Sequence, residues 1–272
     1  MPPKLQIRTL PSRDAIEEWQ TRGKMGRDKS IISLGVRVFA LSVFLIMVLP
    51  SASGTAMNTT AKKVFPTPSN ISQGVKATFN TVNPTYTSST SSSVSYSVTV
   101  TFADGDWVQL GYIKGWVRPT PQSAWVLCST PTLYVEKGFL AEWPPNAVVS
   151  TIRMFGTVSV GSTHTYDIHW TGTSEYYSLW SCYVDGVQIY NAELEPDKLY
   201  TYDVEVQGES WDSNDYSASH VYFNSLKYGK WVFPKRSPAV FQWYGWPSGC
   251  EEEVTGDWHA VFGLASMECW LT

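Results

Sequence analysis

The chain has 272 residues, and aromatic residues make up 14% of it, whereas charged residues make up only 16%. Its formal net charge is −4 at pH 7, and the sequence contains no basic stripe, which argues against nucleic-acid binding. The length exceeds one domain of about 150 residues, but we expect the N-terminal part to lie outside the fold.

Residues 1–56 are predicted to be an N-terminal extension and a secretory signal. Residues 38–49 are almost entirely apolar, basic residues such as Arg37 precede them, and small residues follow them. A membrane-spanning helix needs about 20 apolar residues, so this shorter run favours a cleaved signal and a secreted protein. Met25 is then a more natural start than Met1. The alternative is an uncleaved helix that anchors the protein in a membrane.

The remainder divides into three parts by composition. Residues 57–93 read as a Ser/Thr-rich flexible segment with a first strand, 94–234 as the folded core, and 235–272 as a Trp- and Cys-rich C-terminal extension. In chain order, alternating apolar and polar residues predict strands at 94–102, 107–113, 133–136, 148–155, 165–170, 176–184, 200–207, 220–228, 231–233 and 239–244.

The region 164–194 carries the clearest local signal. Asp185-Gly186 lies between Val184 and Val187, and this dipeptide between apolar strands predicts a tight β-hairpin. Residues 171–174 (TGTS) have the composition of another turn. No segment after residue 60 has a helical period over three turns. We therefore predict an all-β fold, an antiparallel jelly-roll or concanavalin-A-like β-sandwich.

The chain has four cysteines, Cys128, Cys182, Cys250 and Cys269. An even number in a secreted chain predicts two disulfides with three possible connectivities. We favour Cys250–Cys269, which closes a local C-terminal loop, together with Cys128–Cys182. No CxxC occurs and the histidines are scattered, so we expect no metal site and no cofactor.

Two polar residues occupy positions inside otherwise apolar strands. Gln109 lies between Val108 and Leu110, and Glu205 lies between Val204 and Val206. A carboxylate in the middle of a strand indicates a face that is either functional or simply exposed to solvent. Alternation places Glu205 on one face with Asp203 and Gln207.

Across roughly 94–228, the order of these segments resembles the glutamic peptidases of the eqolisin type and neprosin-like proteins of the same fold. The resemblance rests on the segments Gln109-Leu110-Gly111, Tyr134-Val135-Glu136, 180–186 (WSCYVDG), Val204-Glu205-Val206 and 223–226 (FNSL).

This resemblance implies a possible acid endopeptidase activity. Glu205 then matches the catalytic acid, and Gln109 matches its amide partner. The carboxylate would activate water, and the amide would donate to the developing oxyanion, best at acid pH. We expect Trp107, Tyr134, Glu136 and Gln207 to contact the substrate. Glu209 is a competing acid, but it follows Gly208 in a predicted loop.

Other function classes stay open. A non-catalytic, lectin-like module could bind a saccharide or a protein on a concave sheet at the cell surface, and a structural surface protein would need no small ligand. Asp203-Val204-Glu205 also partly matches the acidic strand of sandwich glucanases. The expected ligand is therefore a peptide or a saccharide, and any membrane contact would come from the N-terminal segment.

Overall fold

The computed structural model describes residues 58–66, 72–86, 92–141, 147–211, 216–234 and 237–272, and the predicted signal segment lies outside these ranges. Within them every paired strand is antiparallel, and no helix is present. The described part therefore also holds no helix long and apolar enough to cross a membrane. The prediction of an all-β fold is confirmed.

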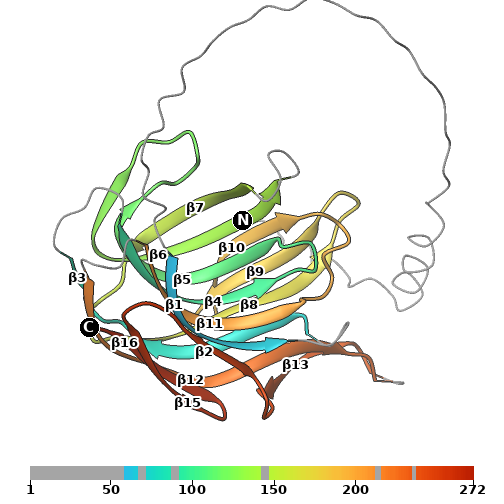
Figure 1. The fold of residues 1–272 in the computed structure, drawn as a ribbon. Coiled ribbons are helices and arrows are strands. Elements are labelled where there is room, and N and C mark those ends of the chain that lie inside the picture. Colours follow the sequence, from blue (N-terminus) through green and yellow to red (C-terminus); the bar gives the residue numbers. More distant parts are fainter. Residues whose placement is uncertain (1–57, 67–71, 87–91, 142–146, 212–215, 235–236) are drawn as a thin grey trace, which may run out of the picture. The chain divides into compact units, whose positions relative to one another are not determined.

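Two sheets face each other in a sandwich (Figure 1). Sheet A has seven strands in the order β14-β1-β11-β4-β5-β6-β7, and sheet B has nine, in the order β10-β9-β8-β2-β12-β16-β15 with β13 and β3 also paired to β12. The strands of sheet A are β1 (Asn58–Pro66), β4 (Ser93–Thr101), β5 (Trp107–Val117), β6 (Val126–Ala141), β7 (Ala147–Thr157), β11 (Asp203–Trp211) and β14 (Glu251–Val254). Those of sheet B are β2 (Gly74–Asn80), β3 (Thr85–Tyr86), β8 (Thr163–Thr173), β9 (Ser178–Val184), β10 (Val187–Leu194), β12 (Tyr216–Val232), β13 (Val240–Gly245), β15 (Trp258–Gly263) and β16 (Ser266–Leu271).

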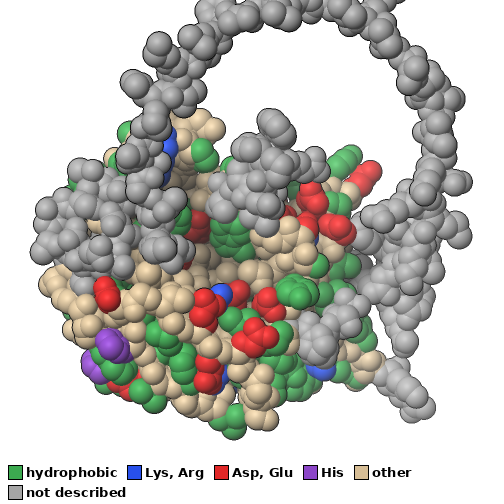
Figure 2. Space-filling view, in the orientation of Figure 1, with side chains coloured by type: hydrophobic (Ala, Val, Ile, Leu, Met, Phe, Trp, Pro, Cys, Tyr) green, Lys and Arg blue, Asp and Glu red, His purple; other side chains and the backbone are tan. Residues whose placement is uncertain are grey.

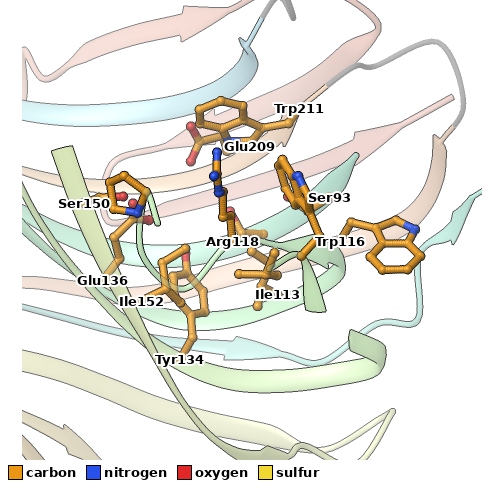
Figure 3. A pocket seen from close by; sticks show the side chains of 14 residues that line it. Ser93, Ile113, Trp116, Arg118, Tyr134, Glu136, Ser150, Ile152, Glu209 and Trp211 are labelled. Carbon is orange, nitrogen blue, oxygen red and sulfur yellow. The ribbon is translucent and has the colours of Figure 1, made fainter. Parts of the chain in front are cut away.

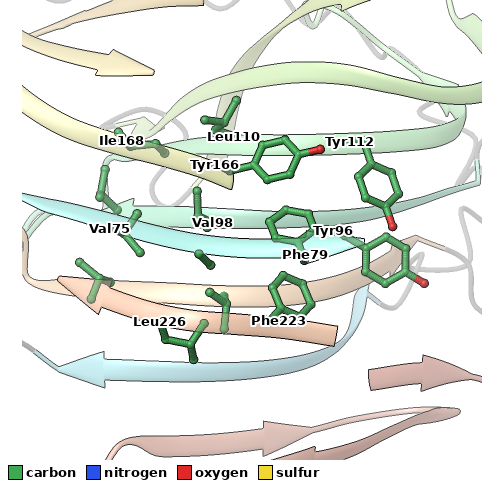
Figure 4. Packing of buried hydrophobic residues seen from close by; sticks show 14 of the residues in the cluster. Val75, Phe79, Tyr96, Val98, Leu110, Tyr112, Tyr166, Ile168, Phe223 and Leu226 are labelled. Atoms are coloured by element: carbon green, nitrogen blue, oxygen red, sulfur yellow. The ribbon is translucent and has the colours of Figure 1, made fainter. Parts of the chain in front are cut away.

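The core lies between the sheets and follows from the alternation of apolar residues along each strand. Val98 and Leu110 of sheet A face Val75 and Ile168 of sheet B, and all four are fully buried (Figure 4). An aromatic cluster extends this core around Phe79, whose ring centroid lies 4.2 Å from that of Tyr166 and 4.6 Å from that of Phe223. Burying each such side chain contributes roughly 1.5–3 kcal/mol. Inward-facing residues are thereby fixed, and their neighbours in sequence must point outward.

The predicted hairpin is present between β9 and β10. Asp185 and Gly186 have φ angles of 52° and 79°, the left-handed values that a two-residue turn of this type requires. The Asp185 carboxylate accepts a hydrogen bond from the Thr165 backbone N–H at 2.8 Å, which ties the turn to β8. The predicted turn at 171–174 begins later, because residues 171–173 continue β8.

The C-terminal region belongs to both sheets. β14 pairs with β1 at one edge of sheet A, whereas β13 and β16 both pair with β12 in sheet B. The described residues from 58 to 272 form one compact unit, in which β13, β14, β15 and β16 complete the sandwich.

The four cysteines are free thiols in this structure, so the predicted disulfides are wrong here. Cys128 lies in an apolar cluster on the outer face of sheet A, whereas Cys182 lies in the core between the sheets. Sheet A therefore separates the first predicted pair. Cys269 is fully buried in the core, while the Cys250 thiol donates to the Pro247 carbonyl at 3.3 Å in a half-buried loop. Sequence spacing did not reveal these different faces.

The four free thiols can be counted by chemical labelling. Alkylation of the denatured protein without prior reduction should add four labels, one for each thiol, and intact-mass spectrometry would count them. Two disulfides would instead leave all four cysteines unlabelled until a reductant is added.

Candidate functional site

The outer face of sheet A, which points away from the core, carries the predicted catalytic residues in one row. Glu205 of β11 pairs with Thr99 of β4, Thr99 pairs with Gln109 of β5, and Gln109 pairs with Glu136 of β6. Residues opposite each other in an antiparallel sheet project to the same side. Their sequence neighbours, such as Val98 and Leu110, are fully buried in the core. The row is therefore directed outward.

The neighbouring row continues the same face. Gln207, Ser97, Gly111 and Tyr134 lie opposite one another on β11, β4, β5 and β6. Trp107 also projects outward, and its ring lies against Gly138, where an added Cβ would come within 2.0 Å of the ring. The structure thus brings all six residues singled out from the sequence to a single face of sheet A.

Gln109 and Glu205 are separated by the strand between them. Two strand spacings place their backbones about 10 Å apart, with Thr99 between them. The Gln109 side chain is only 3% exposed, and its Nε2 donates a hydrogen bond to Ser97 Oγ at 2.7 Å. The Thr99 hydroxyl is buried, and no residue in the described part of the chain is within hydrogen-bonding geometry of it. A substrate group seated over Thr99 would lie between the amide and the carboxylate.

The row of small side chains along β4 makes such seating possible. Ser93, Ser95, Ser97 and Thr99 alternate outward along this strand, between the larger side chains of β11 on one side and those of β5 and β6 on the other. From Ser93 to Thr99 the strand covers about 20 Å. This length matches an extended chain of about six residues.

A cavity of about 340 Å³ opens on this face at the Ser93 end (Figure 3). Glu136 reaches it from the row of Gln109, and Glu209 reaches it from the far end of β11, whereas Gln109 and Glu205 themselves do not line it. The full lining is Ser93, Ser95, Ile113, Trp116, Val117, Arg118, Pro121, Trp125, Tyr134, Glu136, Ser150, Ile152, Glu209 and Trp211.

Two carboxyl groups on this face have strongly raised pKa values. Burial raises the pKa of Glu205 to about 7, against the opposing attraction of Lys62 and with repulsion from Asp203 and Glu209. Burial also raises the pKa of Glu136 to about 7, although a hydrogen bond from Ser150 lowers it. Each carboxyl can therefore gain or lose a proton near neutral pH, as general acid–base chemistry requires.

Sequence reasoning missed the role of β11 beyond Gly208. The strand continues to Trp211, so Glu209 lies in a strand on the outer face and not in a loop. The signal was present, because Glu205, Gln207, Glu209 and Trp211 keep the period of two through the glycine. Trp116, Arg118 and Trp125 had no such pattern, since the bulge between Ile113 and Gly115 interrupts β5 before them.

In the described ranges, no group of three or more His, Cys, Asp or Glu side chains is arranged to hold a metal ion.

No family model and no curated protein matches this sequence. Among solved structures, SCP-B, a member of the eqolisin family of peptidases in complex with the tripeptide Ala-Ile-His, is similar with a TM-score of 0.43 and 12% identity over 80% of this chain and 100% of that chain. Scytalido-glutamic peptidase with a transition state analog inhibitor has a TM-score of 0.45 and 12% identity over the same shares of the two chains. A glycoside hydrolase family 16 endo-glucanase from Bacteroides ovatus has a TM-score of 0.36 and 7% identity over 57% of this chain and 66% of that chain. The structural comparison thus includes the peptidase family that the sequence pattern resembles.

Proposed function

We propose that this protein is an endopeptidase that binds an extended peptide along β4 and hydrolyses it with Glu205 and Gln109. The observation that carries the proposal is their shared row on the outer face of sheet A, with Thr99 between them. The partly buried Glu205 carboxyl, with a pKa of about 7, supports a role in proton transfer.

In this proposal ionised Glu205 takes a proton from a water molecule, which attacks the carbonyl carbon of the scissile peptide. The Gln109 amide nitrogen carries two hydrogens. One is donated to Ser97, and the other donates to the carbonyl oxygen as negative charge develops on it. Protonated Glu205 then delivers the proton to the departing amine. The hydrogen bond to Ser97 would hold the amide in place before the substrate arrives.

A binding function without catalysis is the second candidate, and the cavity rim favours it. Trp125 and Trp211 are 44% and 45% exposed there, which is unusual for such large apolar side chains. Exposed indole faces can stack on a sugar ring or on a peptide side chain. In this alternative the raised pKa values of the carboxyls are a consequence of burial alone.

An assay with two substrates separates these candidates. The protein is incubated between pH 3 and 9 with an unfolded protein and, separately, with a β-glucan, and new amines or new reducing ends are measured. We expect new amines, and we expect Gln109→Ala to lower kcat about 10²–10³-fold, the cost of removing one oxyanion donor.

Gln242→Ala is the matched control, because Gln242 is an exposed glutamine on β13 of the other sheet. It should retain the wild-type rate. Binding of either polymer without cleavage at any pH would refute the peptidase proposal and support the binding candidate.

A further inference from the structure

The cavity contains a set of oxygen atoms suited to a cation. Glu136 and Glu209 contribute carboxyl groups from opposite sides, one from β6 and one from β11 (Figure 3). Their mutual repulsion contributes to the raised pKa of Glu136. A positive charge between them would relieve that repulsion. Whether the cavity can hold a cation also depends on its other polar groups and on its apolar walls.

The hydroxyl of Tyr134 is a third polar group in the cavity. Its side chain is 1% exposed and lines the cavity, and its hydroxyl oxygen makes no hydrogen bond of normal geometry among the described residues, although the hydroxyls of Ser95 and Ser97 lie near enough to lower the pKa of the phenol against the effect of burial. A buried polar group without a partner costs about 1–3 kcal/mol, so a ligand that satisfies it gains correspondingly. An ammonium group has three donors and no acceptor, and it can use the Tyr134 oxygen together with the two carboxyl groups.

The rest of the lining suits the stem of a long side chain. Ile113 and Ile152 provide apolar surface on the cavity floor, and Trp116, Trp125 and Trp211 provide aromatic surface around it. Such walls bury methylene groups, and an indole face attracts a cation by about 0.5–2 kcal/mol. The cavity volume of about 340 Å³ is at the small end for ligand sites, as one side chain of a larger substrate would require.

Arg118 also lines the cavity, and its positive charge would repel a bound cation. It is exposed, its Nε donates to the Ser123 carbonyl at 3.0 Å, and its side chain extends towards Glu209 in Figure 3. One arginine does not balance two carboxylates, so the lining carries a net negative charge when both acids are ionised. Figure 2 also shows acidic side chains gathered on the displayed face, with little Lys or Arg.

We propose that this cavity is a specificity subsite that takes a lysine or arginine side chain of the peptide substrate, between Glu136, Glu209 and the Tyr134 hydroxyl. The inference rests on the proposed function for its substrate class. Glu136 lies directly opposite Gln109, so the subsite adjoins the proposed point of cleavage.

The subsite predicts a coupling between binding and protonation. At pH 7 Glu136 is partly protonated, and a bound cation favours its ionised form. Binding should therefore release a proton and become tighter from pH 5.5 to pH 8. The other charged side chains that line the cavity are Glu209 and Arg118, and we assign the change to Glu136 because its pKa of about 7 lies within this range.

The test measures binding separately from cleavage. The Glu205→Gln variant, which should bind but not turn over, is titrated at pH 7.5 with two hexapeptides that differ by a single lysine or norleucine. Tryptophan fluorescence reports binding, because indoles surround the cavity. We expect the lysine peptide to bind about tenfold more tightly, and we expect adding Glu136→Gln or Tyr134→Phe to remove most of that preference.

Adding Glu193→Gln, an exposed site on β10 of the other sheet, is the matched control and should leave the preference unchanged. Equal affinity for the two peptides, no binding of the lysine peptide, or a preference that survives both cavity substitutions would overturn the subsite. Absence of cleavage in the wild type would refute only the proposed hydrolysis, because this readout needs no turnover.

Discussion

Glu205→Gln should abolish peptide hydrolysis while the fold stays intact. The substitution keeps the size and hydrogen-bonding shape of the side chain but removes the group that would accept a proton from water. A positioned general acid or base contributes about 10²–10⁴ in rate, so kcat/KM should fall by at least that factor. The same Glu193→Gln variant serves as a matched control, since it changes an exposed carboxylate on the other sheet.

The pH dependence of the wild-type rate tests the role of Glu205 as a general base. The Glu205 pKa of about 7 means that its ionised form, the general base, is lost below neutral pH. We therefore expect kcat/KM to fall about tenfold for each pH unit below 7, rather than to peak at the acid pH that the sequence resemblance implies. A rate measured from pH 3 to 9 that stays highest near pH 3–4 would contradict the role of Glu205 as an ionised base.

Much of the fold was predictable because period-two alternation is a local property. The strand at 94–102 was expected from alternating Val and Ser or Thr, and β4 occupies Ser93–Thr101 with Val98 and Val100 fully buried. The Asp185-Gly186 turn was equally local, since two consecutive positive φ angles favour few other residue pairs.

Sheet order was not predictable, because it depends on contacts between distant segments. β11 lies between β1 and β4, which precede it by more than 100 residues, and no pattern within Asp203–Trp211 specifies those neighbours. A first strand was expected within 57–93, but the position of β1 with its two lysines was not predictable, for a related reason. Lys63 is 3% exposed, and its ammonium group is paired with Glu252 of β14 and donates to the Gly263 carbonyl, partners that come from the C-terminal region.

The candidate site was predictable in its faces but not in its shape. Alternation correctly put Glu205 and Gln207 on one side of their strand, whereas the outward direction of Gln109 follows from its pairing with Thr99 in the structure. The cavity, in contrast, forms where the pairing of β5 with β6 is irregular and where Pro121 and Trp125, from the segment between these strands, contribute to its lining. Contacts between a loop and a sheet produce no periodic pattern in the sequence, so the cavity could not be predicted from it.

The partly buried carboxyls of Glu136 and Glu205 should also make the protein less stable as the pH rises. Folding raises the pKa of Glu136 and Glu205 from the ordinary value of 4.5 to about 7, so the folded state binds more protons than the unfolded state between these values. Their stabilising contribution is fully present below pH 4.5 and is lost as the pH rises through 7. Each pKa unit corresponds to about 1.4 kcal/mol, and allowing for partial exposure each carboxyl should account for roughly 2 kcal/mol.

Urea unfolding at pH 5 and pH 8 measures how much folding free energy is lost when Glu136 and Glu205 ionise. The wild type should lose stability between the two pH values, whereas the double variant Glu136→Gln/Glu205→Gln should lose roughly 4 kcal/mol less. Other groups change with pH as well, since burial raises the pKa of Asp203 and hydrogen bonds from His164 and Thr165 lower that of Asp185 against the effect of burial. The difference between wild type and double variant cancels most of these contributions.

Equal losses of stability in the two proteins would mean that Glu136 and Glu205 ionise as freely in the folded state as in the unfolded chain. The proposed chemistry would then lack its poised carboxyl, because a proton-transfer group on this face depends on the same unfavourable burial that destabilises the fold at high pH.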